Sequence, residues 1–180
     1  TVNILAEREV ACESPRIIHL AQAICKGERM EWVVQKAVEL GVAQIHPILT
    51  QYGAYKLDVA RLAKKQQQWQ AIAIAACEQC GRTRIPNVSF PLPLEEFLKQ
   101  EEIGQGYVLD PYSGKSWHEY TAPLGPMTLL IGPEGGLSPK ELDCLLAAGF
   151  LPIKLGPRIL RTETAAISAL SVVQLLWGDL

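Results

Sequence analysis

The chain has 180 residues, 48% of them hydrophobic and 20% charged, and a formal net charge of −2. This composition predicts one folded domain with a sizeable core, and it excludes collagen-like, disordered and disulfide-dense chains. A globally basic nucleic-acid binder is excluded too, although a local basic face is not. No run of eighteen apolar residues occurs, so we expect no membrane span.

The cysteines and the first residues bear on location and domain organisation. Five scattered cysteines, an odd number, favour free thiols in a reducing compartment and hence the cytoplasm. Cys77 and Cys80 form a C-x-x-C, but no second pair and no histidine cluster completes a zinc site, so we expect no metal. The chain begins at Thr1 rather than at methionine, and we interpret residues 1–12 as the tail of a preceding domain or linker.

The apolar pattern predicts strands and helices that alternate along the chain. In chain order we expect a strand at 16–24, a helix at 28–40, a strand at 45–49, a helix at 58–80, a weak strand at 85–90, a short acidic helix after Pro93, strands at 106–110 and 127–132, a helix at 138–148, a strand at 151–155 and a helix at 162–177. This order is typical of an α/β fold, with an open, mostly parallel sheet and helices on both faces.

Several helix ends carry clear signals. Gly41, Gly81 and Gly149 are each expected to end a helix, Gly41 by taking the left-handed cap position. Ser138 opens a capping box with proline at the first helical position. On the long helix at 58–80 we expect an inward apolar side and an outward polar side, with these residues facing inward: Val59, Leu62, Trp69, Ile72, Ala73 and Ala76.

Ligands of open parallel sheets bind at the carboxyl ends of strands, where this chain has three unusual segments. They are Asp110 to Gly114, IGPEGGLSP at 131–139 and LGPRILRTETA at 155–165. The glycines of IGPEGG allow close backbone approach to a ligand, although a tight strand–helix turn explains them equally well. The spacing matches neither the dinucleotide-binding glycine motif nor the P-loop, which needs a lysine after its last glycine.

The third segment contains a cation that helix formation does not explain. Thr162 or Thr164 is expected to cap the last helix, and Glu163 suits its dipole. Arg161 stands at the same helix start, where positive charge is unfavourable. We therefore expect Arg161 to meet an anionic ligand or a negative charge that develops on a substrate.

Four longer motifs carry a resemblance to a known family. They are ERMEWVVQKAVELGV (28–42), QQWQAIAIAACEQCGRTRIP (67–86), LLIGPEGGLSPKEL (129–142) and LGPRILRTETAAISAL (155–170). Together they resemble the RsmE family of the SPOUT methyltransferase superfamily. The resemblance covers about residues 16–180 and implies a SPOUT domain there, with a C-terminal trefoil knot. The family also carries a PUA-like β-barrel, of which residues 1–12 would be a remnant.

The resemblance implies a reaction and a cofactor site. Family members use S-adenosylmethionine to methylate N3 of one uridine in small-subunit (16S) ribosomal RNA. The cofactor would lie against three segments, with these binding residues: Leu109, Pro111, Ile131, Gly132, Pro133, Gly135, Gly136, Leu155, Gly156, Ile159, Leu160 and Thr162. Arg161 would stabilise negative charge on the uracil oxygens. Glu134 or Glu163 would accept the N3 proton or orient Arg161.

The expected RNA contacts lie on a locally basic stretch. The candidate phosphate contacts are Lys56, Arg61, Lys64, Lys65, Arg82 and Arg84, against the alternative of a solvated helix face. Trp117 is predicted to lie in a loop, so it is a better candidate for base stacking than Trp32 or Trp69, which sit among apolar positions.

The expected partners are small-subunit ribosomal RNA, within an assembled 30S subunit, and a second copy of the chain. SPOUT proteins act as homodimers, and the helix at 162–177 is apolar on more than one side. Three alternatives stay open. They are a nucleotide hydrolase that uses IGPEGG as a phosphate cradle, an RNA-binding module without turnover, and a methyltransferase acting on a transfer-RNA ribose 2′-hydroxyl.

Overall fold

A computed structural model describes residues 12–53 and 58–180 of the chain. The predicted remnant at residues 1–12, except Cys12, and the candidate RNA contact Lys56 therefore lie outside the described residues. Within the described ranges, no helix is long and apolar enough to cross a membrane.

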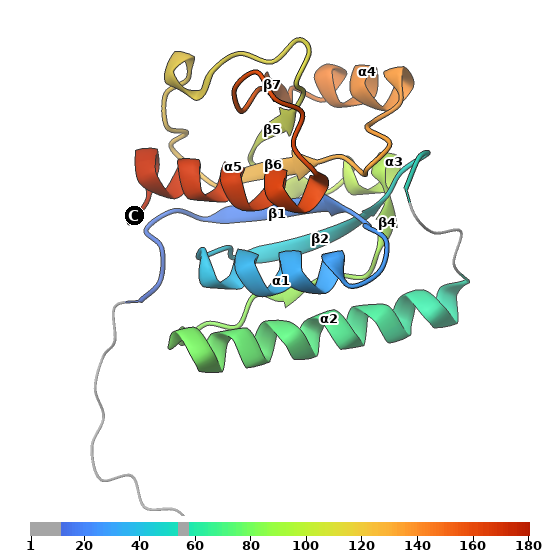
Figure 1. Ribbon diagram of the computed structural model, residues 1–180, viewed down its shortest axis with the longest axis vertical. Coiled ribbons are helices and arrows are strands. Elements are labelled where there is room, and N and C mark those ends of the chain that lie inside the picture. Colours follow the sequence, from blue (N-terminus) through green and yellow to red (C-terminus); the bar gives the residue numbers. More distant parts are fainter. Residues whose placement is uncertain (1–11, 54–57) are drawn as a thin grey trace, which may run out of the picture.

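Strands and helices alternate as predicted (Figure 1). The elements are β1 (Ile18–Ala23), α1 (Arg29–Glu39), β2 (Gln44–Leu49), α2 (Val59–Cys80), β3 (Asn87–Val88), β4 (Leu92–Pro93), α3 (Leu94–Phe97), η1 (Glu101–Ile103), β5 (Gln105–Leu109), η2 (Trp117–Glu119), β6 (Met127–Ile131), α4 (Pro139–Ala147), β7 (Leu151–Ile153) and α5 (Thr162–Trp177). The strand expected at 85–90 is reduced to two residues, because the prolines beside it cannot donate to a ladder.

The seven strands form one sheet in the order β3-β2-β1-β6-β5-β7, with β4 also paired to β2. Every pairing is parallel, which confirms the predicted sheet type. β6 lies between β1 and β5, so the strands of the first half of the chain pair with those of the second half through β1 and β6. The carboxyl ends of β6, β5 and β7 therefore lie side by side at one edge of the sheet.

Helices cover both faces of the sheet, as predicted (Figure 1). Side chains of α1, α2 and α5 pack with Leu129 and Ile131 of β6 in one apolar cluster. Side chains of α3 and α4 pack with Leu130 of the same strand in a second cluster. Successive residues of β6 thus point to opposite faces, and both faces are buried.

Most of the predicted helix ends are confirmed. Gly41, Gly81 and Gly149 have φ angles of 80°, 80° and 85°. Ser138 forms the predicted capping box with Glu141. The cap of α5 differs: Arg161 is the N-cap residue and makes no side-chain cap, because Thr162 is already the first helical residue.

Two predicted side-chain environments are wrong. Val59 is 72% exposed, because it begins α2 and the first buried residue of that helix is Leu62. Trp117, the candidate for base stacking, is 4% exposed. Its ring packs against those of Tyr107 and Trp177, with centroids 5.5 and 5.4 Å away.

Candidate functional site

Main-chain hydrogen bonds join the first unusual segment and Lys115 to Ile153 and Lys154, which lie directly before the third segment. The amide of Asp110 donates to the carbonyl of Ile153 over 2.8 Å, and that of Lys154 donates to Lys115 over 3.0 Å. These bonds continue the β5–β7 pairing beyond the ends of both strands. The chain segment that follows β5 is therefore held against the one that follows β7.

Thr162 joins the second segment to the third. Its hydroxyl donates to the carbonyl of Gly132 over 2.7 Å and accepts from the side-chain amide of Gln22 over 3.0 Å. Thr162 is 4% exposed and Gln22 is fully buried, so this relay is shielded from water. The two glycine-bearing bends, from distant parts of the chain, thus meet at the carboxyl edge of the sheet.

Gln22 and Cys25 belong to this site and were missed by sequence reasoning. Gln22 is an amide in a strand of which every residue is buried, and a polar residue in such a strand was the signal that could have identified it. The thiol of Cys25 lies 4.0 Å from the Thr162 hydroxyl. Burial is the main reason that the pKa of Cys25 rises to about 12, so the thiol stays protonated and is no nucleophile.

Glycine is required at two positions of these bends. A Cβ on Gly114 would lie 2.4 Å from the carbonyl carbon of Ile153 and 2.5 Å from the Asp110 oxygen, both backbone atoms. Gly136 has a φ of +73°, a conformation that side chains disfavour. Asp110 shapes the first bend, because its carboxylate accepts from the amide of Tyr112 and the hydroxyl of Ser113.

The two glutamates of the predicted site both lie near Arg29, the first residue of α1. Glu134 Oε1 accepts from Arg29 Nη1 over 2.9 Å and from the amide of Lys26 over 3.2 Å. Glu163 Oε1 lies 3.8 Å from Arg29 Nε. Burial tends to raise the pKa of Glu134, but main-chain N–H groups and the Arg29 guanidinium together lower it.

Arg161 is exposed at the start of α5. Within the described part of the chain, the ion pairs of Glu134 and Glu163 are with Arg29 and not with Arg161. In this structure the two glutamates therefore contact Arg29, and the orientation of Arg161 by a glutamate stays a prediction. Arg29 was missed, although its place at a helix start gives the same signal that identified Arg161.

The predicted basic contacts separate into two groups. The side chain of Arg61 is 73% exposed, Lys64 and Arg84 are exposed, and Lys65 lies 3.6 Å from Glu31. These four remain accessible to a polyanion.

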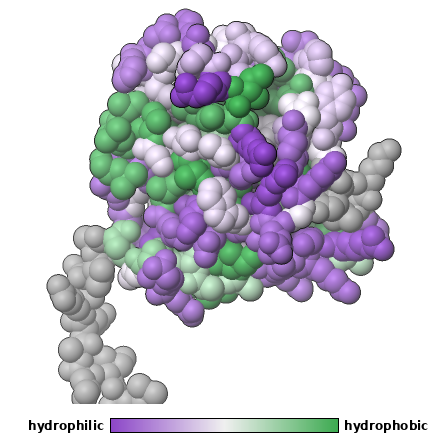
Figure 2. Space-filling view, in the orientation of Figure 1, coloured by the Kyte–Doolittle hydropathy of each residue, from purple (hydrophilic) through white to green (hydrophobic). Residues whose placement is uncertain are grey.

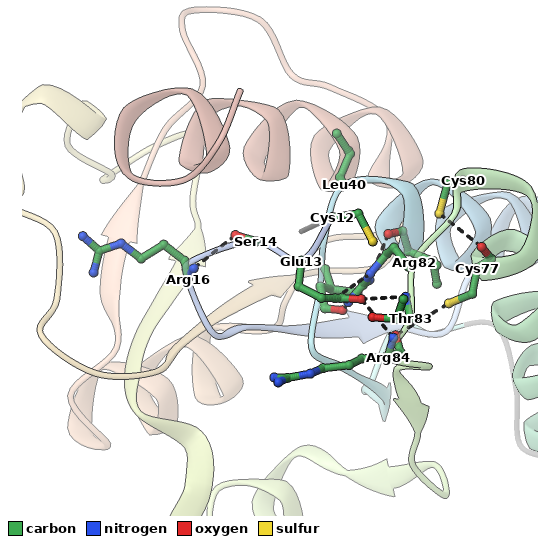
Figure 3. Close-up of polar contacts among 12 residues, drawn as sticks. Cys12, Glu13, Ser14, Arg16, Leu40, Cys77, Cys80, Arg82, Thr83 and Arg84 are labelled. Atoms are coloured by element: carbon green, nitrogen blue, oxygen red, sulfur yellow. Dashed lines mark hydrogen bonds and ion pairs between the residues drawn. The ribbon is translucent and has the colours of Figure 1, made fainter. Parts of the chain in front are cut away.

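Arg82, by contrast, is a wrong prediction. Its side chain is only 6% exposed. Its guanidinium donates to the carboxylate of Glu13 and to the carbonyls of Val38 and Val42 (Figure 3). These contacts use the guanidinium inside the fold, so Arg82 is structural.

No group of three or more histidine, cysteine, aspartate or glutamate side chains in the described ranges is arranged to hold a metal ion.

Comparisons with known proteins agree with this geometry. The RNA methyltransferase domain family matches residues 12–174. The ribosomal RNA small subunit methyltransferase E of Buchnera aphidicola subsp. Schizaphis graminum is 40% identical, over 99% of this chain and 73% of its own length. The enzyme of the same name from Bacillus subtilis is 33% identical, over 93% of this chain and 70% of its own.

Two solved methyltransferase structures are also similar to this chain. A methyltransferase of Legionella pneumophila, solved with bound cofactor SAM, is 51% identical with a TM-score of 0.92, over 96% of this chain and 72% of its own. The ribosomal RNA small subunit methyltransferase E of Neisseria gonorrhoeae, bound to S-adenosyl methionine, is 38% identical with a TM-score of 0.87, over 93% of this chain and 69% of its own. The chain therefore belongs to the RNA methyltransferase family, among relatives named ribosomal RNA small subunit methyltransferase E.

Proposed function

We propose that this chain transfers the methyl group of S-adenosylmethionine to N3 of a uridine in small-subunit ribosomal RNA. The observation that carries the proposal is the hydrogen bond from Thr162 to Gly132, which brings the two glycine-bearing bends together. It lies in a fold that matches a SAM-bound methyltransferase at 51% identity. The substrate class follows from relatives that are named for small-subunit ribosomal RNA.

The residues at this edge fit such a cofactor. An adenine ring needs apolar walls and main-chain groups, and Leu109, Leu155 and Leu160 are partly buried there against the core. Gly156 has a φ of +72° and, like Gly136, leaves open space where a Cβ would stand. We assign the binding to the three segments 109–111, 131–136 and 155–162. When bound, the cofactor supplies an electrophilic methyl group on a sulfonium.

Arg161 is our candidate for stabilising the substrate. It is exposed at the N-cap of α5, where it is free to reach the RNA. Negative charge spreads to the uracil oxygens when the N3 proton leaves, and a guanidinium beside them would stabilise that charge.

The two glutamates are the candidates for accepting the N3 proton. Oε1 of Glu134 already accepts two hydrogen bonds, from Arg29 and from Lys26. Oε2 of Glu163 is buried with no hydrogen-bond partner in the described structure. A free acceptor oxygen favours Glu163 over Glu134 for this task.

RNA would be held by the accessible basic side chains on and near α2. We assign phosphate contacts to Arg61, Lys64, Lys65 and Arg84, in the context of a 30S subunit in the cytoplasm. Phosphate contacts position a protein on RNA without reading its sequence. Their individual loss should therefore weaken RNA binding and its salt dependence without changing cofactor affinity.

We also propose a homodimer and a trefoil knot. The buried side of α5 packs on the core, but Leu175 and Leu176 near its end are 68% and 37% exposed, and Leu124 and Leu180 are exposed as well. Figure 2 shows apolar surface at this end of α5. A second copy would cover it. The return of the chain after β7 to Gly132 supports the knot.

Methylation of unmodified small subunits tests the function. The chain would be incubated with labelled S-adenosylmethionine and either small subunits or transfer RNA, and the modified base mapped. Label at N3 of one uridine in the small subunit is expected. Label on a transfer-RNA ribose, or binding of ATP in place of S-adenosylmethionine, would overturn the proposal. Sedimentation as a monomer at micromolar concentration would contradict the dimer.

A further inference from the structure

Helix formation does not explain an arginine at position 29. It is the first residue of α1, and a cation is unfavourable at a helix N-terminus. Glu28, the N-cap residue, makes no side-chain cap that would compensate. The helix start lies just after β1, at the same edge of the sheet as the bends after β6 and β7.

The guanidinium of Arg29 bridges two of those bends. Glu134, on the bend after β6, is 2.9 Å from Nη1, and Glu163, in the first turn of α5, is 3.8 Å from Nε. The amide of Lys26 adds a second donor to Glu134 from the same loop before α1. Three chain segments therefore share one cluster of charge, beside the neutral relay through Thr162.

The side chains of this cluster are partly exposed to water, which limits what they add to folding stability but not their effect on the shape of the loops. The side chains of Arg29, Glu134 and Glu163 are 43%, 29% and 15% exposed. Ion pairs this open to water add little to folding stability. They can still narrow the range of loop shapes, and a binding site gains affinity when its loops are held in the bound shape beforehand.

We propose that Arg29 is a positioning residue for the cofactor, which acts by holding Glu134 and Glu163 and through them the two bends of the cofactor site. The inference rests on the proposed function, since it assumes that these bends bind S-adenosylmethionine. Arg29 itself touches neither the cofactor nor the RNA base in this proposal. Its loss should raise the Kd and the KM for S-adenosylmethionine by a larger factor than it lowers kcat.

The test is calorimetric binding of S-adenosylmethionine to the full chain and to Arg29→Ala. We expect affinity to fall about tenfold, the size of effect that a lost charge-assisted contact gives. Arg29→Lys should recover part of it, since it keeps the charge but not the bidentate fork. Lys36→Ala is the matched control, because Lys36 lies in the last turn of α1, at the opposite end of the helix from Arg29, and pairs with Glu39 over 2.8 Å.

A double-mutant cycle shows whether Arg29 acts through the glutamates. In a Glu134→Gln background, Arg29→Ala should weaken S-adenosylmethionine binding by no more than about threefold, because much of its effect is already lost. A full tenfold loss in that background would show independent action and overturn the proposal. So would a Tm more than about 4 °C below that of the wild type, since the effect would then be one of stability.

The outcomes distinguish this inference from the proposed function. If the unmodified chain does not bind S-adenosylmethionine, the function fails and the variants are not needed. If it binds and Arg29→Ala binds equally well, the function stands and the inference is overturned. If Arg29→Ala loses affinity for small subunits but not for S-adenosylmethionine, Arg29 contacts RNA phosphate instead, which also overturns it.

Discussion

The molecule contains two arginine–glutamate pairs of almost equal length in very different surroundings. Arg82 and Glu13 approach to 2.7 Å, with side chains 6% and 21% exposed. Arg29 and Glu134 approach to 2.9 Å, with side chains 43% and 29% exposed. The first pair lies just before β1, and the second lies among the bends that we propose to bind the cofactor.

The first pair has more main-chain partners than the second, in which Glu134 accepts from the amide of Lys26. Arg82 also donates to two carbonyls at the end of α1, and Glu13 also accepts from the amides of Thr83 and Arg84 (Figure 3). Each group is thus tied to backbone that the fold already fixes. Arg29 holds side chains on bends instead, so it can affect the shape of the site without being needed for the fold.

The segment around Glu13 has further anchors. The hydroxyl of Ser14 donates to Gln174 of α5 over 2.9 Å, and Arg16 donates to the carbonyls of Trp177 and Pro123. The segment before β1 is therefore fastened to α5 and to the loop before β6. We define residues 12–16 and their partners as the entry clasp.

The largest expected effect comes from breaking the entry clasp with Arg82→Ala. The change leaves the Glu13 carboxylate without its cation and removes the guanidinium donors to the carbonyls of Val38 and Val42, of which Val38 still accepts from the amide of Gly41. We expect the free energy of unfolding to fall by about 3–5 kcal/mol. Urea denaturation measures it, with Arg61→Ala on exposed α2 as a control that should stay within about 0.5 kcal/mol. A loss below about 1 kcal/mol would mean that Arg82 is not structural.

The next largest effect is expected in the bends at the carboxyl edge of the sheet, where Gly114 lies in the bend after β5. Gly114→Ala would push a Cβ into backbone atoms of Ile153 and Asp110, so the first bend must move. We expect a cost of about 3 kcal/mol, near the upper end for overpacking, and a loss of S-adenosylmethionine binding. Gly125→Ala is the matched control, since a Cβ there meets nothing within 4 Å. Equal binding by both variants would remove the first bend from the cofactor site.

Thr162→Val tests the relay between the other two bends with a smaller change. Valine keeps the shape but removes the donor to the Gly132 carbonyl and one acceptor of the Gln22 amide, which keeps its hydrogen bond to the Ala23 carbonyl. We expect about 1–2 kcal/mol of lost stability and weaker S-adenosylmethionine binding. Thr164→Val, two residues later and exposed, should change neither. If the two variants bind S-adenosylmethionine alike, the relay does not shape the site.

The fold was predictable because its signals are local. Alternating apolar segments, the helix-ending glycines and the Ser138 capping box each depend on a few neighbouring residues, and all are confirmed. Arg161 and Thr162 were identified in the same way, from the start of a single helix. Arg29 offered the same local signal, but its partners Glu134 and Glu163 lie more than a hundred residues later in the sequence.

The wrong predictions depend on contacts between distant parts of the chain. Arg82 was predicted to contact RNA because its ion pair with Glu13, 69 residues away in the sequence, leaves no local signal. Trp117 looked like a loop residue free to stack on a base, but Tyr107 and Trp177 enclose it in the fold. Composition and periodicity carry no information on such pairs, since any of several acids or apolar rings would satisfy the local pattern.

The smallest expected effect is a pH dependence of folding stability that differs between Glu13 and Glu134. Burial raises the pKa of Glu13, but Arg82 and the amides of Arg84 and Thr83 outweigh it, so the pKa in the fold lies below the ordinary 4.5. A lowered carboxyl pKa adds stability above the unfolded value and loses it as pH falls through the folded one. Glu13→Gln should therefore be clearly less stable than the wild type at pH 7, and the gap should close below about pH 4.

Glu134→Gln provides the comparison. The pKa of Glu134 is lowered in the same direction, but its partners lie on exposed bends, so the stability gap at pH 7 should be smaller than for Glu13→Gln. Urea denaturation of both variants from pH 7 to pH 3 measures the two gaps. Because all other carboxyl groups are common to the three proteins, their titration cancels in the differences. An equal gap for the two variants would mean that burial and main-chain partners do not distinguish the entry clasp from the cofactor bends.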